Sequence, residues 1–395
     1  MENTGKQAEF VVKRSGIADR RIAVAPMMDW TDRHCRYFLR GFSPHVLLYT
    51  EMITSAAILR GDRQRLLAFD PEEHPVALQL GGSDPTDLAT AAKVGEDFGY
   101  DEINLNCGCP SDRVASGSFG ACLMREPELV ADCVAAMKAS VRIPVTVKMR
   151  IGVVEASKRD TSRAIAQVSD EDIAGLHRFV QLIRDAGCDV AIVHARKAVL
   201  GGLSPKENRE VPPLRYDVVS DLKRAFSALP MIVNGGFRAV DDTLGALEWC
   251  DGAMLGREAY HRPFVLAQLD AALYSSSSGV PGAKTGAHGG SGLDVKKMPV
   301  HSEGNANTKP VLARRTRAAS SAQPAVTREA LLDRMAVYAA REIRKGERLS
   351  AITRHMLGLY SGEPGARDYR RMLSEGAREP GAGPELIRAA APAMA

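Results

Sequence analysis

The stretch Glu102–Ser111, EINLNCGCPS, sets the fold class of this 395-residue chain. A strand-like run ends within it and is followed by a tight Gly/Pro loop that presents a cysteine, Cys109. Gly108 allows the backbone to approach a ligand closely, and Pro110 stiffens the exit from the loop. Because parallel α/β folds place reactive groups in such loops, a thiol here is a candidate acid or nucleophile. The alternative is that Cys107 and Cys109 are small buried hydrophobic residues.

Short apolar runs of the same kind recur along the chain, and each ends in a polar or glycine-containing loop. There are eight in all: Ile22–Ala25, Val46–Tyr49, Val76–Leu80, Glu102–Leu105, Val145–Val147, Val190–Val193, Met231–Val233 and Gly252–Leu255. They alternate with amphipathic segments such as 128–138 and 175–184, which predicts an α/β fold with a parallel sheet and crossover helices. Eight strands close a (β/α)8 TIM barrel of about 250 residues, with function at the carboxyl ends of the strands. An open doubly wound sheet is the alternative, but the first run ends in Ala25-Pro26-Met27-Met28 and not in a G-x-G-x-x-G turn.

Length and composition fit a large soluble enzyme. With 45% hydrophobic residues, the chain can bury a barrel core and still form a second unit. No apolar run approaches the roughly 18 to 20 residues that span a bilayer, and the charged start, Met1–Glu9, lacks a signal-peptide core. We therefore expect a cytoplasmic protein that does not enter a membrane. The seven cysteines are scattered without a Cys-x-x-Cys pair, so we expect reduced thiols and no metal site.

The composition changes abruptly after Tyr274. Residues 275–325 are rich in Ser, Gly, Ala and Pro and contain no Phe, Trp or Tyr, which predicts a flexible basic linker. Helical periodicity returns at 328–343, 349–360 and 369–373. We therefore divide the chain into a barrel domain at 1–274, a linker at 275–325 and a smaller all-α helical-bundle domain at 326–395. A polar segment at 155–171, after the fifth run, is predicted to be an insertion at the barrel mouth or rim.

Polar side chains gather at the predicted carboxyl ends of the strands. They are Glu51, Gln79, Asn106, Cys109, Lys148, Arg150, His194, Arg196, Lys197, Asn234 and Arg257. The pair Gly235-Gly236 follows the seventh run, where barrel loops commonly bind a phosphate through backbone N–H groups, and Arg257 would add a guanidinium there. Gln79, Lys148 and His194 suit hydrogen bonds to a heterocycle, so the set favours flavin mononucleotide (FMN). A lysine at a strand end also suits a Schiff base, as in barrel aldolases, and this alternative stays open.

Several motifs, met in order along the chain, resemble the tRNA-dihydrouridine synthases, and specifically the A subfamily. They are APMMDWTDRH at 25–34, LNCGCPS at 105–111, FGACLM at 119–124, HARK at 194–197, LSPKENR at 203–209, NGG at 234–236, GREAY at 256–260 and RHMLGL at 354–359. The resemblance covers most of the chain outside residues 275–325. It implies a TIM barrel that binds FMN, followed by a helical tRNA-binding domain, and this agrees with the interpretation of both halves from composition and periodicity.

The resemblance also implies roles for single residues. The implied cofactor-binding residues are Pro26, Met27, Met28, Gln79, Lys148, His194, Asn234, Gly235, Gly236, Gly256 and Arg257. The implied tRNA-binding residues are Asn106, Lys206 and Arg209 at the barrel, with Arg367, Arg370 and Arg371 in the tail. Cys109 is the implied catalytic proton donor, whereas Cys107 has no implied role and is expected to pack in the core.

The implied reaction is the reduction of the C5–C6 double bond of a uridine in tRNA. NADPH reduces the flavin, a hydride passes to C6, and Cys109 protonates C5. An unperturbed thiol has a pKa near ~8.5, so it is protonated at neutral pH and yet acidic enough to donate. The A subfamily is associated with D-loop uridines at positions 20 and 20a, which leave their stack more easily than bases in a helix.

Two other functions are compatible with parts of the sequence. A flavin-dependent TIM-barrel oxidoreductase acting on a free pyrimidine or a small enone would have no use for the arginine-bearing tail or for Lys206 and Arg209. An RNA-binding protein with the barrel as scaffold would not need a complete set of flavin and acid positions. We therefore expect an FMN enzyme whose partners are tRNA and NADPH and which acts as a monomer.

Overall fold

The computed structural model describes residues 18–111, 119–156, 161–274 and 326–392. Within these ranges, eight parallel strands form a closed barrel in the order β1-β10-β9-β7-β5-β4-β3-β2. They are β1 (Ile22–Val24), β2 (Leu47–Thr54), β3 (Val76–Gly81), β4 (Glu102–Cys107), β5 (Val145–Arg150), β7 (Val190–His194), β9 (Met231–Asn234) and β10 (Gly252–Leu255). Each predicted apolar run is one of these strands, so the predicted (β/α)8 TIM barrel is confirmed. The predicted linker at 275–325 lies outside the described residues.

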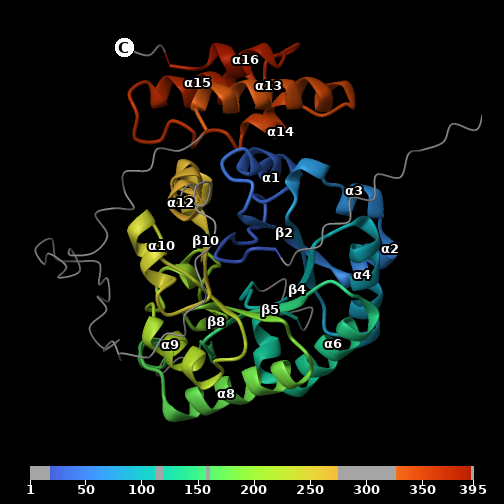
Figure 1. The fold of residues 1–395 in the computed structure, drawn as a ribbon, viewed down its shortest axis with the longest axis vertical. Helices are drawn as coiled ribbons and strands as arrows, with labels where there is room; N and C mark the ends of the chain where they lie inside the picture. The colour runs from blue at the N-terminus through green and yellow to red at the C-terminus, as the bar shows by residue number, and fades with distance from the viewer. Residues whose placement is uncertain (1–17, 112–118, 157–160, 275–325, 393–395) are drawn as a thin grey trace, which may run out of the picture.

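Helices surround the barrel (Figure 1). They are α1 (Arg33–Arg40), α2 (Ser55–Arg60), α3 (Arg63–Leu67), α4 (Pro85–Phe98), α6 (Pro127–Ser140), α7 (Thr161–Ala166), α8 (Asp170–Asp185), α9 (Tyr216–Ala225), α10 (Val240–Ala246), α11 (Arg257–His261) and α12 (Phe264–Tyr274). Short 3-10 helices, η1 (Pro71–Glu73), η2 (Gly120–Arg125) and η3 (Glu207–Arg209), lie in the loops. Side-chain caps start several helices: in α4, Asp84 accepts a hydrogen bond from the backbone N–H of Asp87, and Pro85 occupies the first turn. No described helix has both the length and the apolar character needed to span a bilayer.

Side chains on each strand alternate between the barrel interior and the surrounding helices, because successive residues of a strand point to opposite faces. On β4, Ile103, Leu105 and Cys107 pack in the core between sheet and helices. The intervening residues of β4 face the interior, where Glu102 and Asn104 bond to side chains of other strands. A separate interior cluster contains Ala23, Ala25, Leu47, Tyr49, Ala77, Val190, Ile192, Ile232 and Met254. The barrel interior is therefore packed, and the polar residues of β4 occupy the strand positions that face it.

Two segments extend the barrel at its carboxyl end. Strands β6 (Val153–Glu155) and β8 (Ala198–Leu200) directly follow β5 and β7 and pair as a small parallel sheet. The predicted insertion at 155–171 thus includes the end of β6, helix α7 and the start of α8, and its residues 157–160 lie outside the described ranges. Strand β2 runs to Thr54, five residues beyond the predicted run. Its register with β3 shifts between Tyr49 and Met52, and pairing then continues from Met52 to Thr54.

The tail forms a helical layer beside α1 and α12 (Figure 1). Its helices are α13 (Arg328–Arg344), α14 (Leu349–Thr353), α15 (Ala366–Gly376) and α16 (Glu385–Ala389), so the predicted helical C-terminal region is confirmed. The predicted helix at 349–360 was too long. It ends at Thr353 because the backbone then turns tightly, with the N–H of Met356 donating to the carbonyl of Thr353 at 3.0 Å.

Candidate active site at the carboxyl ends of the strands

A chain of hydrogen bonds runs through the barrel interior toward the Cys109 loop. At its start, Glu102 pairs with Arg20 at 2.7 Å and accepts hydrogen bonds from the hydroxyls of Tyr49 and Thr146, both at 2.6 Å. Thr146 in turn accepts from the amide of Asn104 at 2.8 Å. The buried carboxylate can only accept, so both hydroxyls must donate to it and the oxygen of Thr146 is left to accept.

The same chain continues through two more amides to the loop. Gln79 donates to Asn104 at 2.7 Å and accepts from Asn106 at 2.8 Å. The side-chain oxygen of Asn106 then accepts from the backbone N–H groups of Gly108 and Cys109, both at 3.0 Å. An acceptor-only carboxylate at one end and donor-only N–H groups at the other therefore fix the orientation of all three amides.

The two cysteines of the loop have different environments. Cys107 is the last outward-facing residue of β4, is fully buried, and has its pKa raised well above the ordinary value by burial. Cys109 is partly exposed at the mouth, and its carbonyl accepts from the N–H of Ala121 at 2.9 Å. The expectation that Cys107 packs in the core is confirmed. Of the two thiols, Cys109 is the one that can meet a substrate.

Two cationic side chains and a histidine lie near Cys109, on strands β5 and β7. Lys148, on β5, donates to the side-chain oxygen of Asn234 at 3.0 Å, and burial followed by the charge of Arg150 lowers its pKa to about 7. Arg150 is buried and donates to the carbonyls of Gly108, Lys197 and Asn208 at 3.2, 3.1 and 2.9 Å. Burial and these cations also hold the pKa of His194 well below its ordinary value. In the part of the chain that the structure describes, neither Lys148 nor Arg150 forms an ion pair with a carboxylate.

The predicted glycines of the phosphate corner have backbone angles that favour glycine. Gly235 and Gly236 have φ of 117° and 80°. A Cβ on Gly235 would lie 2.7 Å from the ring of His194, and one on Gly236 would lie 2.5 Å from Leu214. Beside them, the Asn234 amide donates to the carbonyl of Met254 at 2.7 Å. The pair thus gives a close-fitting backbone surface at the mouth.

The other predicted cofactor positions flank the β1–β10 seam of the barrel. The backbone N–H of Met27 donates to the hydroxyl of Thr31 at 2.9 Å, and Met28 is 56% exposed. Gly256 precedes α11, and Arg257 pairs with Glu210 at 2.6 Å near the surface. Among the predicted cofactor residues, Gln79, Lys148, His194 and Asn234 face the interior with Cys109, while this second group lies on the loops above the seam.

The predicted tRNA-binding residues fall into three environments. Asn106 is 9% exposed, and its amide oxygen and nitrogen already bond to the protein. Lys206 and Arg209 are exposed at η3, where the charge of Arg257 lowers the pKa of Arg209 in addition to the larger effect of burial. Arg367, Arg370 and Arg371 are exposed on α15, and Arg371 pairs with Asp368 at 2.9 Å.

The positions that sequence reasoning missed are those of the interior chain: Glu102, Asn104 and Thr146. Their signal was present, since EINLNC on β4 and VTVKMR on β5 both place polar residues at every second position of an otherwise apolar strand. Within the described ranges, no group of three or more His, Cys, Asp or Glu side chains is arranged to hold a metal ion.

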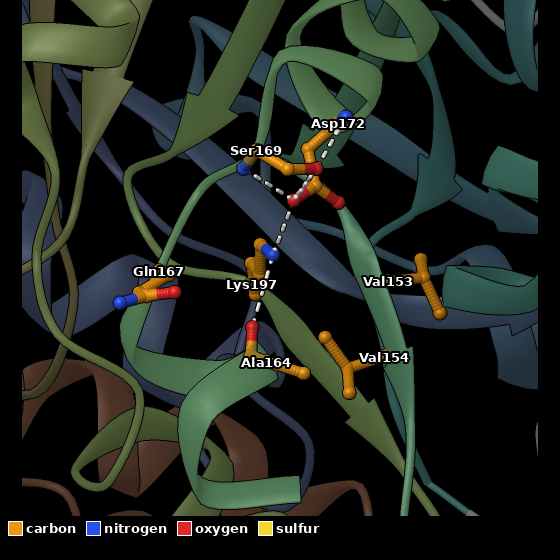
Figure 2. A pocket seen from close by; sticks show the side chains of 7 residues that line it. All are labelled: Val153, Val154, Ala164, Gln167, Ser169, Asp172 and Lys197. Atoms are coloured by element: carbon orange, nitrogen blue, oxygen red, sulfur yellow. Dashed lines mark hydrogen bonds and ion pairs between the residues drawn. The ribbon is translucent and has the colours of Figure 1, made fainter. Parts of the chain in front are cut away.

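A separate pocket of about 400 Å³ lies at the insertion, lined by Val153, Val154, Ala164, Gln167, Ser169, Asp172 and Lys197 (Figure 2). Lys197 points into it, and donates to Asp172 at 2.7 Å and to the carbonyl of Ala164 at 3.0 Å. The charge of Lys197 is already paired with Asp172. Lys197 therefore links the insertion to the loop after β7, whose carbonyl at Lys197 accepts a hydrogen bond from Arg150.

Comparison with known proteins agrees with this geometry. The model of the dihydrouridine synthase family matches residues 23–282. The chain belongs to this family, a class of flavin-dependent oxidoreductases.

Similarity to individual relatives extends over almost the whole chain. The tRNA-dihydrouridine(20/20a) synthase of Xanthomonas axonopodis pv. citri is 48% identical over 373 residues, which cover 94% of this chain and 93% of the relative. The proteins of the same name from a Synechocystis species and from Shewanella oneidensis are 47% and 46% identical, and each alignment covers 93% or 94% of this chain and 93% of the relative.

Proposed function

We propose that this protein is a tRNA-dihydrouridine synthase that uses FMN and NADPH to reduce D-loop uridines at positions 20 and 20a, with Cys109 as proton donor. The observation that carries the proposal is the partly exposed Cys109, held by Asn106 at a barrel mouth that contains Lys148, Arg150 and His194. The names of the relatives point to the same substrate and the same two positions.

The residues at the mouth fit FMN. Its ring system needs hydrogen-bond partners. Gln79 has an amide oriented by Asn104 and Asn106, and Lys148 lies close enough to Cys109 to interact with it electrostatically. Its phosphate needs backbone N–H groups and a cation, which Gly235, Gly236 and Arg257 would supply. When bound, FMN supplies the hydride for C6 of the uridine.

The protein's own residues supply the remaining chemistry. Reduction at C6 leaves negative charge that spreads toward O4, and a proton at C5 completes the reaction. Cys109 would hold that proton as a neutral thiol and release it at the reacting carbon.

For tRNA, we propose that Lys206 and Arg209 at the mouth and Arg367, Arg370 and Arg371 on α15 contact phosphates. Arginine suits this role because its guanidinium binds phosphate through two parallel hydrogen bonds. Asn106 is also proposed to contact the tRNA, in addition to its hydrogen bonds with the loop. We propose two units, 1–274 and 326–395, joined by 275–325, in a monomer that meets tRNA in the cytoplasm.

The test is complementation of a bacterial cell that lacks its own dihydrouridine synthases. Purified tRNA from cells supplied with this protein should contain dihydrouridine at positions 20 and 20a by nuclease digestion and mass spectrometry. The purified protein should be yellow and should oxidise NADPH. A yellow protein that reduces free uracil or a small enone but leaves tRNA unchanged would favour the small-molecule oxidoreductase. A colourless protein that forms a Schiff base would favour the aldolase.

A further inference from the structure

The barrel closes where its first and last strands pair, and the tail packs above that closure. Strand β1 pairs with β10, with Ile22 opposite Ala253 and Val24 opposite Leu255. Two segments follow these strands, residues 25–32 after β1 and residues 256–261 after β10, and we call them the seam segments. Together they hold five of the proposed cofactor positions, namely Pro26, Met27, Met28, Gly256 and Arg257.

One buried side chain of the tail bonds to both seam segments. His355 is 1% exposed; its Nε2 lies 3.0 Å from the carboxylate of Asp32 and its Nδ1 lies 3.2 Å from the hydroxyl of Tyr260. Because the carboxylate can only accept, Nε2 carries the proton in the first of these bonds. The neighbouring Arg354 also donates to Asp32, at 2.5 Å. The tail therefore contacts the first segment at Asp32 and the second at Tyr260.

In the first seam segment, the contact at Asp32 is one residue from the turn that holds Met27. Asp32 caps α1 by accepting from the N–H of Cys35 at 2.9 Å. Thr31 accepts from the N–H of Met27 at 2.9 Å, and the N–H of Thr31 donates back to the carbonyl of Met27, also at 2.9 Å. Trp30 donates to the same carbonyl at 3.1 Å. A shift of Asp32 would therefore move the backbone at the proposed cofactor position Met27.

The two seam segments also contact each other, which makes them one unit. The ring of Trp30 stacks on that of Tyr260, with centroids 4.4 Å apart and planes inclined by 18°. Tyr260 lies on α11, whose first residue is Arg257. The tail approaches this unit through its backbone, since a Cβ on Gly358 would lie 2.5 Å from the carbonyl oxygen of His261 and 2.8 Å from that of Tyr260.

We propose that His355, supported by Arg354, is a positioning residue for the flavin site: the tail holds the two seam segments in the geometry that retains the cofactor. The tail then has a role at the cofactor as well as at the RNA. This inference rests on the proposed function, because it places FMN at the barrel mouth.

The test compares two tail–barrel contacts that meet the barrel at different places. His355→Ala removes the hydrogen bonds to the seam segments. Arg341→Met removes the ion pair between Arg341 and Asp70, a tail–barrel contact beside η1 and away from both segments. The dissociation constant of FMN is measured by flavin fluorescence on the full-length chain, with the thermal melting temperature of each variant recorded beside it.

We expect His355→Ala to raise the FMN dissociation constant by about five- to tenfold, since it removes two buried hydrogen bonds from the seam segments. Arg341→Met should lower the melting temperature and leave the FMN dissociation constant within twofold of the parent. His355→Gln should restore most of the affinity, because a glutamine amide can donate to Asp32 and accept from Tyr260. Tyr260→Phe keeps the ring stack and removes the hydroxyl that contacts His355 at 3.2 Å and the carbonyl of Arg354 at 3.4 Å. It should weaken FMN binding by about two- to threefold, and it replaces His355→Ala as the test if that variant does not fold.

Two results would overturn the inference alone. One is an unchanged FMN dissociation constant in both His355→Ala and Tyr260→Phe. The other is an equal loss of affinity in Arg341→Met, which would mean that docking of the tail in general matters and not the seam contact. A parent protein that binds no FMN would overturn the proposed function and the inference with it.

Discussion

The cations of the barrel mouth and those of the tail face opposite surroundings. Arg150 is buried against carbonyl groups, and Lys148 bonds to an amide, with no carboxylate partner for either among the described residues. In the tail, Arg341 and Arg354 pair with Asp70 and Asp32 of the barrel. Buried charge without a partner is costly to a folded protein, whereas paired charge at an interface is not. The cations of the mouth therefore suit a ligand that carries negative charge, whereas the cations on the inner face of the tail attach the tail to the barrel.

The outer face of the tail shows a third arrangement. Arg367, Arg370 and Arg371 are exposed on α15, where their charges are screened by solvent and cost little in stability. Cations in such a place suit a polyanion that arrives from solution. Positive charge thus has three expected roles: binding a ligand at the mouth, attaching the tail at the interface, and binding a polyanion on the outer face. Each role can be tested with its own variant.

The largest effect should come from the thiol at the mouth. We expect Cys109→Ala to keep FMN and NADPH oxidation but to lower dihydrouridine formation by ~10²–10⁴-fold, the usual contribution of a general acid. Single-turnover reduction of tRNA by the reduced enzyme measures this step. Cys107→Ala is the matched control and should stay within a few-fold of the parent. Normal tRNA reduction by Cys109→Ala would remove the assignment.

The next effect concerns Lys148, which bonds to the amide of Asn234 and has no carboxylate partner among the described residues. Lys148→Met should weaken FMN by roughly 10- to 100-fold, the value of a hydrogen bond to a charged group. Titration of the apoprotein with FMN, followed by fluorescence, gives the affinity. If the affinity is unchanged, Lys148 does not face the cofactor.

The same residue gives a pH dependence of stability. With a folded pKa of about 7, against 10.5 ordinarily, Lys148 loses its proton earlier in the folded state than in the unfolded state. The unfolded state thus binds more protons between pH 7 and 10.5, so Lys148 contributes a rise in apoprotein stability across that window. Below pH 7, Lys148 is charged in both states, and its burial lowers the free energy of unfolding by the full amount. Between pH 7 and pH 9.5, the free energy of unfolding from urea denaturation should change more positively in the parent than in Lys148→Met.

A smaller effect is expected on the outer face of the tail. Replacing Arg367, Arg370 and Arg371 by glutamine should weaken tRNA binding by roughly tenfold and reduce the salt slope by about 0.7–0.9 for each phosphate that is no longer neutralised. NADPH oxidation should continue at the parental rate. Filter binding at several salt concentrations measures the affinity and the slope. An unchanged salt slope would move tRNA recognition to Lys206, Arg209 and the other loops of the mouth.

The smallest effect should have the opposite sign. Glu210 pairs with Arg257 at the surface, where such pairs are worth about 0–1 kcal/mol. Glu210→Gln would leave Arg257 available to a phosphate and should tighten FMN by up to about fivefold. Glu128→Gln, which breaks a surface pair with Arg178 away from the mouth, is the control and should leave FMN affinity unchanged. Weaker binding by Glu210→Gln would show that Arg257 needs Glu210 for its position.

Most of the fold could be predicted because a barrel strand has a local signature. Runs such as Val190–Val193 are apolar on both faces and end in polar loops, which periodicity detects. The end of β2 could not be predicted in this way. Thr50 and Glu51 read as a loop, and in the structure they form an irregularity after which pairing with β3 resumes at Met52. The end of α14 at Thr353 also could not be predicted, since the tight turn that follows it depends on the bond from the N–H of Met356 to the carbonyl of Thr353 and not on helix propensity.

The site could be predicted residue by residue only where a motif marks it. Cys109 lies in such a motif, and the structure brings it together with Lys148 and His194. His355 contacts Asp32, 323 positions away in the sequence, and Tyr260, 95 positions away. No local sequence pattern predicts contacts over such separations. The alternation of polar residues in β4 marks Asn104 as different from its apolar neighbours, but its partners Gln79 and Thr146 lie on other strands and are known only from the structure.

The hydrogen-bond chain from Glu102 to the Cys109 loop has a consequence for how this sequence can diverge. Each amide in the chain is oriented by its neighbours, so a donor replaced by an acceptor at one position would leave two like groups facing each other in a buried site. A single substitution at Gln79, Asn104 or Thr146 is therefore expected to be deleterious, whereas a simultaneous change of two bonded partners could be neutral. These positions should drift as one set over evolutionary time, far more slowly than the exposed arginines of α15.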